Sequence, residues 1–143
     1  MHKEIDLEQR AMGFLSGQAC DAATKRWLVL MNVNSQANLR AAAMMNSMPS
    51  VSIAAFSKIH DEKEKASILT SMFSSKDRSN LTSIGYEVIS GMSDMSLLWD
   101  IFQAQAVPKE LKPHIERRIE LLAGTAEPKD YREIIRLNRK GQR

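Results

Sequence analysis

The sequence predicts an all-α fold, either a compact array or a right-handed superhelix of eight or nine short helices. Helix start signals recur along the chain, and apolar residues follow them three and four positions apart. Neither an alternating apolar run nor an Asn-Gly hairpin turn indicates a strand. Helices this short are marginal alone, because nucleation costs more than one or two turns return. We therefore expect them to be stabilised by stacking on their neighbours.

Three helices are expected in the first third of the chain, over residues 5–19, 22–31 and 36–48. Asp21 and Ser35 are the residue types that cap a helix N-terminus. The second helix ends in an almost wholly apolar half, which predicts that it is buried. The run of three alanines, residues 41–43, permits close packing between helices.

The stretch from residue 48 to residue 84 reads as three short helices in succession. Pro49 suits a first helical turn, and Asp61 suits an N-cap, with Glu64 placed to complete a capping box. Ser74 and Ser75 offer the N-cap of the third helix. The apolar residues that follow each signal at helical spacing predict one buried stripe per helix.

Start and stop signals continue in the last third. Gly91 is expected to end one helix, Asp94 to open the next and Pro108 to terminate it. Helices over residues 109–122 and 128–140 complete the prediction. The residues expected to be largely buried are Trp27, Leu28, Leu39, Phe56, Leu69, Phe73, Leu81, Leu98, Trp99, Phe102, Ile115 and Ile119.

The pattern of Pro49, Ala54, Asp61 and the segment 65–69 (KASIL) resembles the short-helix repeats in the middle domain of the flagellar rotor switch protein. The cytoplasmic N-terminal domain of bacterial magnesium channels is built from similar repeats. The resemblance covers about a quarter of the chain and implies a helical superhelix with a role in assembly. Residues 46–50 keep little beyond the proline of the family's partner-contact stretch, so that contact is not carried over.

Length and composition bound the class of protein. The chain has 143 residues, about one domain, which we divide into residues 1–47, 48–92 and 93–143. One cysteine, Cys20, excludes an intramolecular disulfide framework and fits a reducing compartment. No apolar stretch is long enough to span a bilayer, and the charged N-terminus is unlike a signal peptide. We expect a cytoplasmic protein.

The charge is concentrated at the C-terminal end. Residues 108–143 hold ten Lys/Arg and six Asp/Glu, whereas residues 1–107 hold ten and eleven. The last helix carries a basic stripe, with Ile135 beside it, that could contact an acidic protein partner or nucleic acid. A solvated helix face would have the same composition. The partner-binding candidates are Arg132, Arg136, Arg139, Lys140 and Ile135.

No catalytic constellation stands out. His2, His60 and His114 are scattered, without a second histidine or a cysteine at metal-ligand spacing. Cys20 precedes a helix but has no histidine nearby in sequence, so burial as a small hydrophobic residue is the expected role. We expect neither catalytic residues nor a metal or other cofactor, and no enzyme.

The sequence therefore favours a non-catalytic protein–protein interaction module, an adaptor or an assembly subunit of a larger bacterial complex. The alternative is a nucleic-acid-binding protein that uses the basic C-terminal helix. The sequence does not decide the oligomeric state.

Overall fold

The computed structural model describes residues 2–17, 20–78 and 80–124, and in this part of the chain it confirms the all-α prediction. Eight α-helices and one short 3-10 helix, η1, are present in these ranges. The right-handed superhelical course remains a prediction. The helices are α1 (His2–Ser16), α2 (Ala22–Asn32), α3 (Gln36–Ala43), α4 (Pro49–Lys58), α5 (Glu62–Phe73), α6 (Leu81–Ser90), α7 (Met95–Gln103), η1 (Lys109–Leu111) and α8 (Lys112–Ala123).

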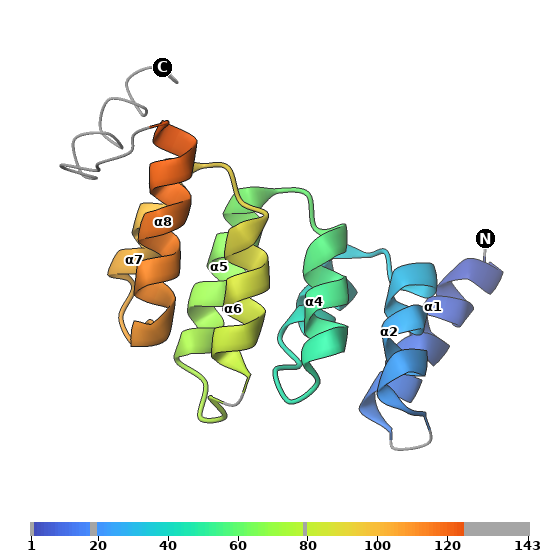
Figure 1. Cartoon of the computed structure of the whole chain (residues 1–143). Coiled ribbons are helices and arrows are strands. Elements are labelled where there is room, and N and C mark those ends of the chain that lie inside the picture. The colour runs from blue at the N-terminus through green and yellow to red at the C-terminus, as the bar shows by residue number, and fades with distance from the viewer. Residues whose placement is uncertain (1, 18–19, 79, 125–143) are drawn as a thin grey trace.

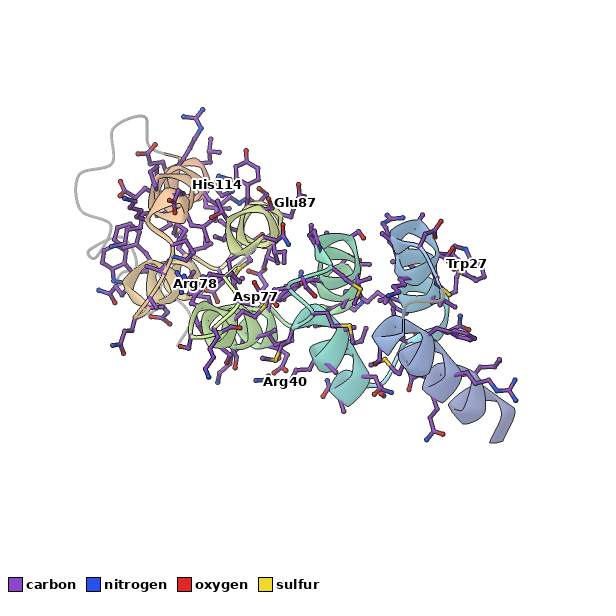
Figure 2. All side chains as sticks on the ribbon, turned by 90° about the horizontal axis from the view of Figure 1, so that it is seen from below. Trp27, Arg40, Asp77, Arg78, Glu87 and His114 are labelled. Atoms are coloured by element: carbon purple, nitrogen blue, oxygen red, sulfur yellow. The ribbon has the colours of Figure 1, made fainter. Side chains whose placement is uncertain are left out.

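The helices form successive pairs that stand side by side, from α1–α2 at one end to α7–α8 at the other (Figure 1). Viewed from below, the odd-numbered and even-numbered helices form two rows (Figure 2). In the even row α4 packs against both α2 and α6, and α6 packs against α8; in the odd row α1 contacts α3 and α5 contacts α7. The core lies between the two rows.

Four of the expected N-caps are confirmed by hydrogen bonds. Asp21 accepts from the backbone N–H of Thr24, and Ser35 accepts from that of Asn38. Asp61 and Asp94 likewise accept from backbone N–H groups in the first turns of α5 and α7. These side chains satisfy donors that the helix itself leaves without an acceptor, which is why the helices begin where they do.

Four expected boundaries were wrong. Helix α1 ends at Ser16 rather than at residue 19. Helix α3 ends at Ala43, so the segment before Pro49 is a turn rather than a continued helix. Ser74 ends α5 instead of starting the next helix, and α6 begins after Asn80, whose φ of 64° is left-handed. Helix α7 ends at Gln103, well before Pro108. In each case local turn conformations end or begin the helix where the sequence offers no single strong signal.

Most of the expected core is confirmed. Leu39, Phe56, Leu69, Phe73, Leu81, Leu98, Ile115 and Ile119 are buried, while Leu28, Trp99 and Phe102 are half-buried and pack against the core. Trp99 and Phe102 stack with ring centroids 5.0 Å apart, and Lys112 Nζ lies 5.2 Å from the Phe102 ring centroid. The expectation for Trp27 was wrong, because 56% of this residue is exposed.

A four-helix unit recurs with an offset of 59 residues. The N-cap Ser35 of α3 corresponds to the N-cap Asp94 of α7, and Pro49 corresponds to Pro108. Buried positions correspond as well, for example Val29 with Val88, Leu39 with Leu98, Ala42 with Ile101 and Phe56 with Ile115. The unit α1–α4 and the unit formed by α5, α6, α7, η1 and α8 therefore match in their caps, prolines and buried positions. Few of the positions related by this offset hold identical residues.

A glutamate joins two helices within each unit, and although the two glutamates stand at different positions of the unit, the backbone groups that they bind correspond. Glu8 of α1 accepts hydrogen bonds from the backbone N–H groups of Asn34 and Ser35, ahead of α3. Glu62 of α5 accepts from those of Ser93, at 2.7 Å, and Asp94, at 3.0 Å, ahead of α7. A carboxylate from the neighbouring odd helix thus fixes the start of the next one.

Candidate interaction surface

The basic stripe proposed from the sequence lies outside the described residues. This holds for Arg132, Arg136, Arg139, Lys140 and Ile135 alike. Their role as partner-binding residues remains a prediction.

An exposed apolar face on α2 is the most prominent surface feature of the described chain. Trp27 and Met31 are one helical turn apart and are 56% and 60% exposed. Trp27 projects from the side of α2 that faces away from α4 (Figure 2). Two more large apolar residues, Leu7 and Phe14, are exposed on the neighbouring α1. The first helix pair therefore carries four of the seven exposed large hydrophobic residues of the described chain.

The orientation of α2 follows from what its opposite face buries. Lys25, Val29 and Val33 recur every fourth residue and are all buried, and Trp27 lies about 200° around the helix from Val29. Lys25 tolerates burial because its Nζ lies 2.6 Å from the carbonyl oxygen of Gly17 and 3.6 Å from Met48 Sδ. With this face against α4, the indole has no place in the core.

Hydrogen bonds from Lys58 hold the C-terminal end of α2 in the orientation that keeps Val29 and Val33 buried. Its Nζ lies within hydrogen-bond distance of the carbonyl oxygens of Val29, Leu30 and Val33 and 3.0 Å from Asn34 Oδ1. The Leu30 carbonyl is one that the helix end leaves without a backbone donor, whereas the Val29 carbonyl also accepts from the backbone N–H of Val33. Burial lowers the pKa of Lys58, while the nearby charge of Glu8 raises it; the net direction is downward.

A polar cluster around His114 lies between α6 and α8. Its ring stacks on Tyr86 with centroids 3.9 Å apart, and Nε2 lies 3.0 Å from Ser90 Oγ and 3.2 Å from the carbonyl oxygen of Tyr86. The Ser90 hydroxyl donates to the same carbonyl at 2.7 Å. Nε2 can donate to the Tyr86 carbonyl or accept from the Ser90 hydroxyl, depending on which ring nitrogen carries the proton. These contacts join α8 to α6.

The remaining candidates from the sequence are dispersed. Cys20 is a half-buried free thiol, and His60 lies exposed between α4 and α5. The described residues contain no group of three or more His, Cys, Asp or Glu side chains arranged to hold a metal ion. Glu62 accepts from the backbone N–H groups of Ser93 and Asp94, and Glu64, expected to complete a capping box with Asp61, instead accepts from Arg40.

A small pocket of about 210 Å³ lies between α4 and α6, where the two four-helix units meet. Phe56 and Val88 contribute to its apolar wall, and Lys65 and Glu87 bring charges of opposite sign. Its size suits a side chain rather than a cofactor.

Comparison with known proteins adds no relative: no protein-family model matches, and neither curated proteins nor solved structures give a match. The resemblance to rotor switch and magnesium channel repeats therefore remains an expectation. Within the described residues, none of the helices is both long and apolar enough to cross a bilayer.

Proposed function

We propose that this protein is a non-catalytic interaction module, an adaptor or assembly subunit of a larger bacterial complex that works in the cytoplasm. The observation that carries the proposal is the concentration of exposed apolar side chains, Trp27 among them, on the first helix pair. The single cysteine supports the reducing compartment.

Two physical arguments favour a docking role for this surface. Contiguous exposed apolar surface commonly marks a place where another molecule binds, and Trp27 and Met31 are neighbours four residues apart on α2. Tryptophan is also among the residues that contribute most to binding free energy when a partner covers them. Lys25 and Lys58 hold α2 in a fixed orientation, so the surface is formed before any partner arrives.

Site-specific photo-crosslinking in the native host tests the proposal. A photoreactive phenylalanine analogue replaces Trp27 in one strain and the exposed Arg117 of α8 in a control strain. We expect position 27 to yield a discrete protein adduct that position 117 does not yield. A matching adduct pattern at the two positions, or none at position 27, would contradict the proposal.

Nucleic-acid binding is the second candidate, and the excess of ten Lys/Arg over six Asp/Glu in residues 108–143 favours it. Reversing Arg136 and Arg139 to Glu should then weaken binding to DNA or RNA and lower its salt dependence, because fewer phosphates are neutralised. Fluorescence anisotropy at two salt concentrations measures both effects. If the protein is instead an interaction module, reversing Arg136 and Arg139 to Glu should weaken its binding to an acidic protein partner, mainly because the association rate falls.

A further inference from the structure

We propose that the exposed face of α2 binds an amphipathic helix with acidic flanks from a partner protein. Trp27 and Met31 would make the apolar contact, and Arg26 would face a carboxylate of that helix. This inference rests on the proposed function and specifies the chemistry of the partner.

The segment that contains α2 is free of acidic residues. Between Asp21 and Asp61 the chain has no Asp or Glu, and it has four Lys/Arg. The segment covers α2, α3 and α4 completely. A partner that approaches this part of the molecule therefore meets no carboxylate belonging to these three helices.

Of the four cations in this segment, three already have partners in the described chain. Lys25 and Lys58 bind backbone oxygens, and Arg40 NH1 lies 3.1 Å from Glu64 Oε1. Arg26 differs, because it is exposed and has no carboxylate partner among the described residues. It is thus the cation of α2 that is available to a partner.

The exposed face of α2 has a regular geometry. Ala23, Trp27 and Met31 follow one another at intervals of four residues and are all exposed, so they form a stripe along α2. Arg26 precedes Trp27 and lies about 100° around the helix, on the flank of that stripe. An apolar stripe with a cation on its flank is complementary to a helix that carries apolar anchors and a flanking acid.

Two other occupants fit the face less well. A second copy docked with its own α2 against α2 would bring Arg26 against a helix that carries no Asp or Glu. Nucleic acid needs several cations to gain appreciable affinity, and α2 offers one. An acidic amphipathic helix satisfies the apolar stripe and the arginine together.

The test uses the full chain and two fluorescein-labelled peptides of about 18 residues, long enough to become helical when docked. Both peptides have the same leucine stripe, and their flanking positions are all Glu in one and all Lys in the other. Fluorescence anisotropy gives each dissociation constant at low and at high salt. We expect the Glu peptide to bind about fivefold tighter or better at low salt, and the preference to shrink at high salt.

Three variants assign the effect to named residues. Arg26→Glu should remove or invert the preference between the peptides, whereas the control Arg117→Glu on α8 should leave it unchanged. Trp27→Ala should weaken both peptides at least about tenfold, as for a central aromatic contact. Circular dichroism checks that each variant keeps its helical content.

The other outcomes overturn the inference. Equal affinity for both peptides would show that Arg26 does not select an acid, and an effect of Arg117→Glu equal to that of Arg26→Glu would place the contact elsewhere. No binding of either peptide would also contradict it, as would a concentration-dependent dimer that Trp27→Ala abolishes. A crosslinked partner at position 27 combined with any of these results would leave the proposed function standing while this inference fails.

Discussion

Lys25 and Trp27, two residues apart on α2, show how side-chain reach decides burial. The lysine is 8% exposed because its Nζ ends on the Gly17 carbonyl oxygen and the Met48 sulfur, with its methylene groups in the interior. The indole is 56% exposed because the face of α2 that packs on α4 is set by Val29 and Val33. From hydrophobicity alone, one would expect the tryptophan to be buried and the lysine to be exposed.

Truncation of Leu69 tests the interior at the scale of one residue. Leu69 is fully buried in α5, so Leu69→Ala should lower the free energy of unfolding by about 2–5 kcal/mol through lost contacts and a residual cavity. Leu121 on α8 is 63% exposed, and Leu121→Ala should change it by no more than about 0.5 kcal/mol. Urea denaturation measures both. Similar losses for the two variants would show that the phase of α5 is wrong.

Gly85 is a second single-residue test, because α6 and η1 approach closely there. A β-carbon at Gly85 would lie 2.5 Å from Cδ1 and 3.2 Å from Cδ2 of the fully buried Leu111. We expect Gly85→Ala to lower the free energy of unfolding by about 1–3 kcal/mol, since overpacking outweighs the gain of about 1 kcal/mol in helix propensity.

Gly91 supplies the matched control for this substitution. A β-carbon there would meet nothing closer than the Val88 carbonyl oxygen at 3.8 Å. Gly91→Ala should therefore stay within about 0.5 kcal/mol of the unchanged protein in thermal or urea unfolding. A Gly85→Ala protein that is as stable as the Gly91→Ala protein would mean that the α6–η1 contact is looser than described.

Among the helices, α1 is joined to the start of α3 by the hydrogen bonds of Glu8. Burial tends to raise the pKa of Glu8, but the N–H groups of Asn34 and Ser35 and the Asn38 side chain together hold it below its ordinary value of 4.5. A carboxyl whose pKa is lower in the folded protein stabilises the fold above its unfolded pKa. That contribution is lost as the pH falls through the folded pKa.

Glu8→Gln should accordingly destabilise the protein at pH 7, and the difference from the unchanged protein should diminish as the pH falls below 4.5. Thermal unfolding followed by circular dichroism over that pH range measures the difference. Glu87 is exposed on α6, and Glu87→Gln serves as the control that should show no such convergence. A constant gap between Glu8→Gln and the unchanged protein at all pH values would show that the charge of Glu8 plays no part.

At the scale of the whole molecule, the two four-helix units meet chiefly where α4 packs on α6, and Arg40–Glu64 is an ion pair across the same junction. The two side chains are 40% and 39% exposed, so water screens their attraction. A double-mutant cycle with Arg40→Ala and Glu64→Ala, followed by urea denaturation, should give a coupling energy of about 0.2–1 kcal/mol. A coupling of several kcal/mol would mean that the pair, rather than the α4–α6 core, joins the units.

The sequence predicts what short-range physics determines. Asp21, Ser35, Asp61 and Asp94 cap helices as expected, because a cap needs only the residue and the turn that follows it. What the sequence did not predict depends on distant partners. Glu62 reaches Ser93 and Asp94, Glu64 reaches Arg40, and the exposure of Trp27 depends on which face of α2 meets α4.

The candidate surface illustrates the same limit. The basic residues near the C-terminus stood out in the sequence because charge can be counted along a chain. The α2 face did not, since its apolar residues read as core until their neighbours are known. The absence of acids between Asp21 and Asp61 was a signal within reach of the sequence that could have drawn attention to this segment.

The glutamates that join the odd helices also bear on the order in which the chain can fold during synthesis. Glu8 and Lys58 both bind backbone groups near Asn34, so these hydrogen bonds can form as soon as the ribosome has released α4. Glu62 has to wait until Ser93 and Asp94 emerge about thirty residues later. Contacts between residues that are close in sequence favour rapid folding. An early segment can therefore fold before a later one is synthesised. The growing chain can thus complete its first four helices, with the α2 face already presented to a partner, while its second half is still being made.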